Sequence, residues 1–308
     1  MAKVERNEIP PRGKIKNLAA SIKARLLNYS KENRIEYQGV FRLYVQERFL
    51  YRVSRSAYSK KFILKGALLF LAFNISKYRP TKDIDFLGTS VENDAEVLKK
   101  IIKEILLIDF EDGLTFDPES IEAEEIVETQ EYHGIRIKFN VFLKKARDRI
   151  QIDIGFGDPI YEGPVEIDYP VLLDLPSPKL LAYSIESAIA EKFEAIVSRG
   201  FATSRMKDFF DILHFAEKRK FESGKLKEAI KITFNNRNTD LNNRYAVFSS
   251  DFKKDKVKQS MWTTFLNQRK LKSESEFEKV IERLELFVEP IFQLNENKIW
   301  NPENWSWE

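Results

Sequence analysis

The chain has 308 residues, 43% hydrophobic and 32% charged, with no cysteine and a formal net charge of +3. These values predict an ordered protein of two domains. They exclude disulfides and thiolate metal sites, and they fit a reducing, cytoplasmic setting. The two histidines, His133 and His214, lie in no recognisable zinc or catalytic-triad motif, so neither chemistry is favoured.

No membrane association is expected, and the positive charge is concentrated near the N-terminus. Residues 1–7 lack the apolar segment of a signal peptide, and the most apolar stretch, 62–75, is too short to cross a bilayer. Residues 1–61 hold 15 Lys and Arg against 5 Glu, a net +10, which leaves −7 for the remainder. A basic N-terminal quarter suits a polyanion such as RNA, although a solvated helix surface explains the same residues equally well.

The N-terminal quarter predicts two helices after a polar arm at 1–13. Apolar residues recur at helical spacing over 14–28 and again over 36–55. On the second helix Arg48, Arg52 and Arg55 lie near one another, where they could either flank the core or face phosphates. We therefore expect residues 1–61 to form a basic N-terminal helical segment.

A nucleotide-binding turn is expected where a strand at 62–64 reaches Gly66. The glycine lets the backbone turn into a buried helix over 67–73 without a Cβ in the way. Such a strand-to-helix turn leaves backbone N–H groups available to a phosphate. Lys65 and Ala67, which flank Gly66, are assigned to the same nucleotide-binding turn, although this signal is weak by itself.

Asp83 and Asp85 occupy alternate positions in a strand that includes Ile84 and Phe86. Alternate residues share a face of a strand, so both carboxylates point the same way. Two close carboxylates raise each other's pKa, and a cation between them keeps both ionised. Divalent metals on carboxylates suit phosphoryl chemistry. The alternative is a strand end with two solvated acids.

The rest of the expected core combines one helix with several strands. The helix spans 91–107, with Ser90 as its N-cap. Gly134 marks a hairpin turn between two of the strands, and one or two short strands fall within 165–173. The longer strands are expected at 121–127, 135–143 and 149–155. We place the end of the core at residue 175, before the Pro-Ser-Pro sequence at 176–178.

Residues 176–308 are expected to form a C-terminal helical domain. Ser204 is the expected N-cap of one of its helices. Three of the four tryptophans lie in the last ten residues, which we expect to pack back on this domain. The helices are predicted over 183–198, 204–215, 226–234, 252–266 and 276–294.

Asp153 lies on the strand 149–155, on the face opposite its isoleucines. If that strand lies beside the Asp83 strand, Asp83, Asp85 and Asp153 form a cluster able to hold one or two Mg²⁺ (or Mn²⁺) ions that bridge the triphosphate of an NTP. Asp153 could also help to deprotonate an acceptor hydroxyl. Most of the catalysis would come from positioning and charge neutralisation.

The helical domain offers further site candidates in Lys192, Lys207, Asp208 and Asp211. From spacing alone, a local pair between Lys207 and Asp211, four residues apart, is favoured. In the functional interpretation Lys192 neutralises a phosphate, while Asp211 or Asp208 orients that lysine or the base.

The sequence resembles the AbiEii/AbiGii-type nucleotidyltransferase toxins of toxin–antitoxin and abortive-infection systems. The similar segments occur in the family's order and cover most of the chain. They are residues 46–50, 62–67, 79–85, 152–158, 169–170, 172–176, 190–195 and 204–211.

The resemblance implies an α+β fold similar to polymerase-β-like nucleotidyltransferases, with N-terminal helices, a core at 62–175 and an added C-terminal helical domain. It implies that Gly66 and its neighbours bind the nucleotide phosphates and that Thr81 supplies a hydroxyl close by. The family often has Gly or Ser at the position of Ala67, so one side-chain contact is lost here, and we expect activity to survive. The remaining matches are the metal carboxylates Asp83 and Asp85, the third acid Asp153, and Lys192, Lys207, Asp208 and Asp211 in the helical half.

The function implied is metal-dependent transfer of NMP from an NTP to an acceptor, with the tRNA 3′ end as the favoured acceptor and a block of translation as the result. A cognate antitoxin is implied by the family alone. The alternative is a non-catalytic RNA-binding or partner-binding module on the same fold, which the basic N-terminal quarter favours and the survival of all three acids disfavours. A metal nuclease would use the same carboxylates but would leave Gly66 and Lys192 unexplained.

Overall fold

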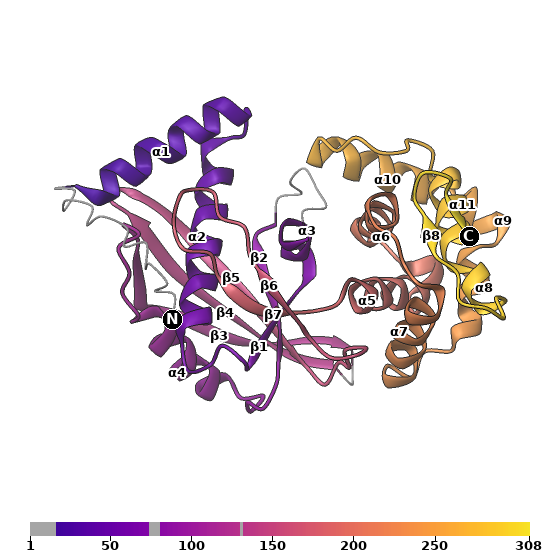
Figure 1. Cartoon of the computed structure of the whole chain (residues 1–308), viewed down its shortest axis with the longest axis horizontal. Helices are drawn as coiled ribbons and strands as arrows, with labels where there is room; N and C mark the ends of the chain where they lie inside the picture. Colours follow the sequence, from indigo (N-terminus) through magenta and orange to yellow (C-terminus); the bar gives the residue numbers. More distant parts are fainter. Residues whose placement is uncertain (1–16, 74–80, 130–131) are drawn as a thin grey trace, which may run out of the picture.

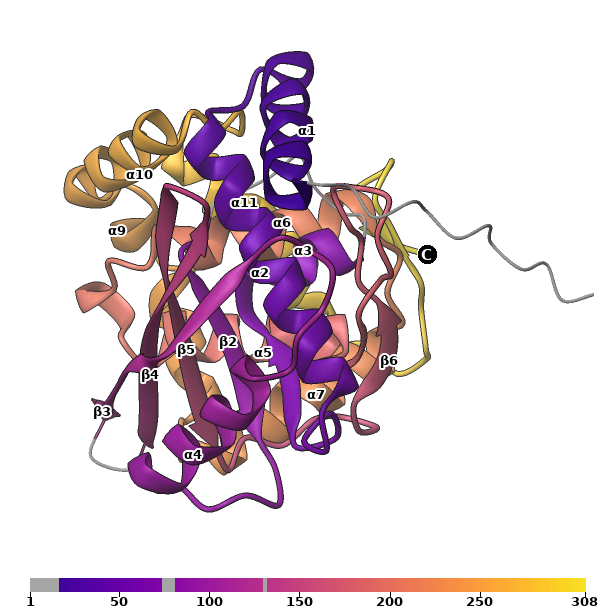
Figure 2. The ribbon, with the colours of Figure 1, turned by 90° about the vertical axis from the view of Figure 1, so that its left-hand side faces the viewer.

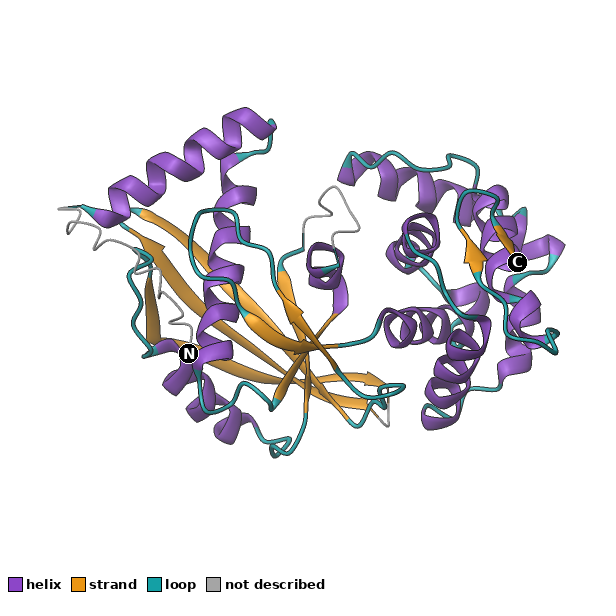
Figure 3. Cartoon of the chain, in the orientation of Figure 1, coloured by secondary structure: helices purple, strands orange, loops and turns teal. Residues whose placement is uncertain are grey.

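The computed structural model describes residues 17–73, 81–129 and 132–308. The expected N-terminal arm and the first two residues of the family segment 79–85 lie outside the described residues. Strands and the first helices make one half of the molecule, and the remaining helices make the other (Figures 1 and 3). The expected α+β class, with N-terminal helices and a C-terminal helical half, is confirmed.

A seven-stranded mixed sheet forms the centre of the first half, in the order β3-β4-β5-β2-β1-β7-β6. β2 runs parallel to β5, and β1 runs parallel to β7, whereas the other neighbours are antiparallel. The strands are β1 (Phe62–Lys65), β2 (Asp83–Gly88), β3 (Thr115–Thr129), β4 (Tyr132–Leu143), β5 (Ala146–Phe156), β6 (Val165–Asp168) and β7 (Lys179–Ala182).

Two helices, α2 (Tyr37–Arg55) and α4 (Ala95–Leu106), lie in front of the strands when the molecule is viewed from the side away from the helical half (Figure 2). α1 (Leu18–Asn33) packs on α2. α2 is buried over most of its length, including Val40, Phe49 and Val53, because apolar residues fall on every side of it.

Arg48 and Arg52 of α2 serve the core and do not face a phosphate site, whereas Arg55 is exposed. Arg48 and Arg52 are buried. Arg52 forms an ion pair of 2.5 Å with Asp112, and Arg48 donates to the carbonyl of Pro176 at 2.9 Å. A buried guanidinium needs such partners because its desolvation is costly. The first of the two interpretations of these residues, flanking the core, therefore fits the structure.

The second half is an assembly of helices that follows β7 (Figure 1). The predicted helix at 252–266 is divided in two, and the helix predicted over 276–294 ends earlier and continues as a 3₁₀ turn. The helices are α5 (Ile185–Val197), α6 (Met206–Lys218), α7 (Ser223–Asn236), α8 (Arg244–Val247), α9 (Ser250–Lys253), α10 (Lys256–Arg269) and α11 (Phe277–Val288). The 3₁₀ turns are η2 (Gly200–Ala202), η3 (Leu241–Asn243) and η4 (Pro290–Phe292).

The tryptophan-rich C-terminus packs on the helical half, as predicted. It forms a small hairpin of β8 (Trp300–Asn301) and β9 (Ser306–Trp307). The indole N–H groups of Trp300, Trp305 and Trp307 donate to carbonyls of α6 and α11 at 2.8, 3.1 and 2.9 Å. Each bond satisfies the polar end of a large apolar ring.

Two expectations about turns and boundaries are wrong. Gly134 is not in the turn but inside β4, opposite Ile126, where a Cβ would lie 2.9 Å from the carbonyl oxygen of Ile154. The sheet also continues beyond residue 175, because β7 pairs with β1 through Leu64 and Ala182. The short apolar sequence of β7 is too brief to show periodicity, so the Pro-Ser-Pro sequence looked like a boundary.

Two helix starts also differ from the sequence expectation. α4 begins after Asp94, whose carboxylate accepts from the N–H of Val97, and not after Ser90. α6 begins after Arg205, which makes no side-chain cap, and not after Ser204. α5 begins after Ser184, whose hydroxyl accepts from the N–H of Ser187. None of the helices in the described ranges is long and apolar enough to cross a membrane.

Candidate active site

The two aspartates of β2 lie beside a third aspartate on the neighbouring strand. β2 and β5 pair in parallel, and their register sets Asp85 opposite Asp153 and Asp83 opposite Gln151. Since alternate residues share a face, the three carboxylates lie on one side of the sheet, and the intervening Ile84 is buried on the other. The adjacency of the two acid-bearing strands, on which the predicted cluster depended, is confirmed.

Gly66 sits directly against Asp85. Gly66 follows the last residue of β1 and is the first residue of the 3₁₀ turn η1 (Gly66–Leu68), which leads into α3 (Leu69–Ala72). Its φ is +72°. A Cβ at this position would lie 1.9 Å from Oδ2 of Asp85. The turn therefore needs glycine for its left-handed backbone and for the close approach of the carboxylate.

A cleft of about 860 Å³ lies over these residues, between the sheet and helices α5 and α6. It brings together all the site residues expected from the sequence except Asp211, which is fully buried behind Lys192. Those in the lining are Lys65, Gly66, Ala67, Thr81, Asp83, Asp85, Asp153, Lys192, Lys207 and Asp208.

Asp83 and Asp85 carry charge that the protein does not neutralise directly. Neither carboxylate makes an ion pair within residues 17–73, 81–129 and 132–308. Burial raises the pKa of both groups, and the charge of Asp153 raises it further. The positive charge of Lys207 offsets part of this rise. A bound cation would relieve the cost of keeping both carboxylates ionised.

Asp153, by contrast, is neutralised by an arginine. The guanidinium of Arg136, on the adjacent strand β4, donates from Nε to Oδ1 at 2.8 Å and from its terminal nitrogen to Oδ2 at 2.7 Å. The amide of Gln151 lies 3.2 and 3.3 Å from the same two oxygens. This two-pronged geometry is the strongest form of arginine–carboxylate pairing.

Lys192 projects from α5 toward two aspartates of α6. Its Nζ lies 2.7 Å from Oδ2 of Asp211 and 3.4 Å from Oδ1 of Asp208, which also accepts a bond from Arg205. Burial opposes ionisation of Asp208, yet the charges of Lys192, Arg205 and Lys207 together hold its pKa below the ordinary value. The local pair between Lys207 and Asp211 that spacing favoured is not formed, and Lys207 faces the cleft instead.

Thr81 supports the start of β2. Its hydroxyl donates to the carbonyl of Asp83 at 3.3 Å and lies 3.4 Å from the N–H of the same residue. The side-chain amide of Gln46, from α2, donates to the Thr81 carbonyl at 3.3 Å. These contacts fix the chain immediately before the first aspartate.

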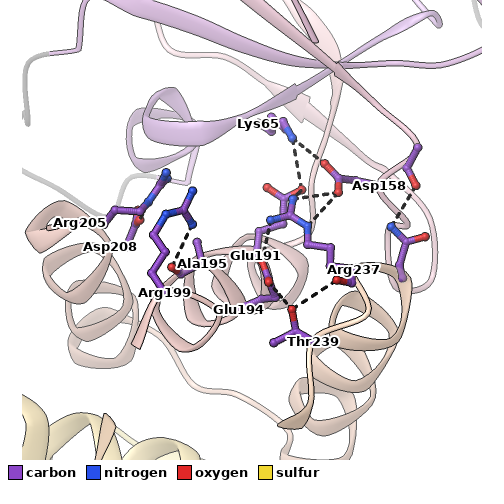
Figure 4. A network of polar contacts seen from close by, with 12 residues as sticks. Lys65, Asp158, Glu191, Glu194, Ala195, Arg199, Arg205, Asp208, Arg237 and Thr239 are labelled. Carbon is purple, nitrogen blue, oxygen red and sulfur yellow. Dashed lines mark hydrogen bonds and ion pairs between the residues drawn. The ribbon is translucent and has the colours of Figure 1, made fainter. Parts of the chain in front are cut away.

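Lys65 is held by carboxylates from two other segments (Figure 4). Its Nζ lies 2.9 Å from Oδ2 of Asp158, just after β5, and 3.3 Å from Oε1 of Glu191 in α5. Burial alone would lower the pKa of this lysine, but the two carboxylates outweigh burial and raise it. Lys65 therefore keeps its charge and ties β1 to the helical half.

Arg237, which ends α7, extends this network. It contacts Asp158 at 2.9 Å, Glu191 at 3.4 Å and Glu194 at 2.9 Å, and Figure 4 shows its guanidinium among the acidic groups. The hydroxyl of Thr239 donates to Glu194 at 2.6 Å. The Asp158 contacts join the end of the sheet to α7 through ionic groups that are buried or partly buried. We call Lys65, Asp158, Glu191, Glu194 and Arg237 the ionic network.

The donor set fits a divalent metal on Asp83 and Asp85. Carboxylate oxygens are the preferred ligands of Mg²⁺ and Mn²⁺, and these two groups lack a cationic partner within the described residues. No group of three or more His, Cys, Asp and Glu side chains is arranged to hold a metal in that part of the chain. The engagement of Asp153 by Arg136 is consistent with that result.

Several residues of the cleft were missed by the sequence reasoning. Arg136 had a usable signal, because it alternates with buried isoleucines on β4 and the tight turn from Leu143 to Ala146 sets it opposite Asp153. Arg237 had none, since it comes from the end of a helix far along the chain. The other cationic residues missed are Lys82, Arg199, Arg205 and Arg269.

Replacing Gly66 by Ala is expected to lower both stability and activity. Holding an alanine at positive φ costs about 1–2 kcal/mol, and its Cβ would displace Asp85. A displacement of about 1 Å at a reacting group costs on the order of 100-fold in rate. Gly157→Ala is the matched control, because Gly157 has a φ of +81° with nothing within 4 Å of its Cβ position. Urea unfolding should show a loss of stability for both variants, larger for Gly66→Ala because of the added contact with Asp85, and only Gly66→Ala should lose turnover. Equal turnover in the two variants would contradict the close contact with Asp85.

Comparison with solved structures finds similarity over most of the chain. JHP933 from Helicobacter pylori is 14% identical, with a TM-score of 0.46 over 87% of this chain and 92% of that chain. The nucleotidyltransferase toxin MenT4 from Mycobacterium tuberculosis H37Rv is 16% identical, with a TM-score of 0.47 over 89% of this chain and 98% of that chain. A search of curated proteins gives no match.

Residues 48–283 match the protein family described as "Nucleotidyl transferase AbiEii toxin, Type IV TA system". The matched segment starts within α2 and ends within α11. It therefore includes the acid-bearing strands, the Gly66 turn and the helices that carry Lys192 and Lys207. The chain belongs to the AbiEii nucleotidyltransferase toxin family.

Proposed function

We propose that this toxin transfers NMP from an NTP to an acceptor hydroxyl in the cleft, that the reaction depends on Mg²⁺ or Mn²⁺, and that the acceptor is the 3′ end of a tRNA. The observation that carries the proposal is the placement of Asp83 and Asp85 against the Gly66 turn, on the floor of a cleft whose opposite wall carries Lys192 and Lys207. Two carboxylates that have no cationic partner among the described residues, with a facing set of cations, suit a metal-bound triphosphate.

Both halves of the molecule would contribute residues to the reaction, the sheet half the metal ligands and the Gly66 turn, and the helical half two lysines. Asp83 and Asp85 would hold the metal, which when bound neutralises phosphate oxygens as a Lewis acid. Backbone groups of the Gly66 turn would approach the triphosphate closely, since no side chain stands there. Lys207 would add a positive charge from α6. Lys192, fixed by Asp208 and Asp211, would present its charge from α5 in a set position.

The charge of the cleft supports an acceptor that is itself a polyanion. Nine Lys and Arg side chains line the cleft against six Asp and Glu. A metal-bound triphosphate would leave part of this positive charge for a second anionic substrate, as expected of an RNA strand. We propose that modification of tRNA 3′ ends blocks translation in the cytoplasm. We also propose that a cognate antitoxin inhibits the protein.

The test is transfer of label from each α-³²P-labelled NTP to total RNA, with Mg²⁺ or Mn²⁺ or with excess EDTA. We expect label in tRNA-sized RNA with at least one NTP and none with EDTA. A γ-labelled NTP should give no labelled RNA, because the α-phosphate is the one that is transferred. Periodate-oxidised tRNA, which lacks its terminal hydroxyls, should also remain unlabelled.

Other outcomes discriminate between the alternatives. Label in RNA after periodate treatment would move the acceptor away from the 3′ end. Label in protein would indicate that the acceptor is a protein and not RNA. Absence of transfer with all four NTPs and both metals, from folded protein, would favour the non-catalytic binding module.

A further inference from the structure

The third carboxylate of the cluster is already saturated by protein groups. A carboxylate offers about four lone-pair positions to hydrogen-bond donors or a metal. Arg136 takes one position on each oxygen of Asp153, at 2.8 and 2.7 Å, and the amide of Gln151 lies within 3.3 Å of both oxygens. Little room remains on Asp153 for a metal ion.

The backbone holds this arrangement in place. Arg136 and Asp153 lie opposite each other in the antiparallel β4–β5 pair. Gln151 lies two residues before Asp153 on β5, so its side chain is on the same face. The Arg136 side chain is 30% exposed and Asp153 is 21% exposed, so the pair is screened only in part. A bidentate pair set by strand register loses less side-chain freedom than a pair of flexible surface groups.

The charges of the site separate into two parts. Asp83 and Asp85 together offer two negative charges, which one divalent cation neutralises. Asp153 offers one further negative charge, which Arg136 neutralises. Releasing Arg136 would leave three free carboxylates, which is a donor set for two divalent ions.

We propose that Arg136 takes the place of a second metal ion, so that the resting site of this toxin binds one divalent cation, on Asp83 and Asp85. This inference rests on the metal dependence proposed above. The guanidinium supplies a fixed positive charge beside the metal-bound pair, from the strand next to β5.

The test counts bound Mn²⁺ by electron paramagnetic resonance in the purified, metal-free full-length protein, without nucleotide. Wild type should bind one Mn²⁺ per chain, and Arg136→Met should bind two. Arg136→Lys should remain at one, because the charge beside Asp153 is kept. Lys82→Met is the matched control, since it removes one positive charge beside Asp83 without touching Asp153, and it should also remain at one.

The outcomes separate this inference from the proposed function. Two Mn²⁺ ions in wild type, or one in both wild type and Arg136→Met, would overturn the role of Arg136 and leave the transferase proposal standing. Two ions in Lys82→Met as well would show a general charge effect and would also overturn it. No Mn²⁺ bound to wild type, together with EDTA-resistant transfer, would overturn metal dependence itself. Far-UV circular dichroism of each variant establishes that it is folded.

Discussion

Asp85→Asn is expected to cut nucleotidyl transfer by roughly 100- to 1,000-fold, the range for loss of one preorganised charge-stabilising group, while making the metal-free protein more stable. Asn keeps the size of the side chain, but it lacks the charge that would bind the metal. The same charge is unfavourable in the metal-free protein, because burial and the charge of Asp153 raise the pKa of Asp85. Removing the charge should therefore stabilise the metal-free fold and reduce transfer at the same time.

The gain in stability should depend on pH with a defined sign. A carboxyl whose folded pKa is raised destabilises the native state once the pH exceeds its unfolded pKa, and the loss is complete above the folded pKa. The melting temperature of Asp85→Asn should therefore exceed that of wild type at pH 8, and the difference should shrink at pH 4. In a chain of this size, each kcal/mol corresponds to about 2–4 °C.

A partnered aspartate outside the cleft supplies the control. Asp148 accepts bonds from Arg42 at 2.9 and 2.8 Å, so Asp148→Asn should lower the melting temperature and leave transfer unchanged. Full transfer activity in Asp85→Asn would contradict the proposed role of Asp85 in holding the metal. A lowered melting temperature in Asp85→Asn, with lost transfer, would attribute the loss to misfolding.

Local pattern was enough to predict much of the acid-bearing surface. The alternation of Asp83, Ile84 and Asp85 predicts two carboxylates on one face, and the same rule places Asp153. The polar and apolar faces of these strands do not identify their neighbours, so the pairing of β2 with β5 remained a condition until the structure showed it. The turn at Gly66 was predicted correctly as a strand-to-helix turn, but its contact with Asp85 depends on the antiparallel pairing of β1 with β2, which sets Lys65 opposite Asp85.

The rest of the site could not be predicted because it joins distant segments. The ionic network takes Lys65 from β1, Asp158 from the turn after β5, and Arg237 from the end of α7. Each is a common residue in an ordinary local context, and spacing favours near neighbours. That preference produced the wrong pair of Lys207 with Asp211, where the fold instead brings Lys192 across from α5.

Removing the guanidinium of Arg237 is expected to cause the largest loss of stability among these variants. Arg237→Met leaves Asp158, Glu191 and Glu194 with fewer cationic partners while their surroundings remain buried. Deleting one partner of a buried ionic group costs about 3–5 kcal/mol, because the remaining charge is left uncompensated. The free energy of unfolding in urea, measured at pH 8, should fall by that amount.

The pH dependence of the loss distinguishes stranded charge from lost packing. The charge of Arg237 lowers the pKa of Glu191. Without Arg237 that pKa should be higher, so the folded variant takes up protons more readily as the pH falls. The difference from wild type should be largest at pH 8 and smaller at pH 5.5.

Arg149→Met, which removes one partner of the exposed pair with Glu122, should cost no more than about 1 kcal/mol at either pH. Arg237→Lys should recover part of the stability, since it restores charge without the forked contacts. A loss in Arg237→Met that is equal at both pH values, or no larger than that of Arg149→Met, would mean that the ionic network does not hold the helical half to the sheet electrostatically.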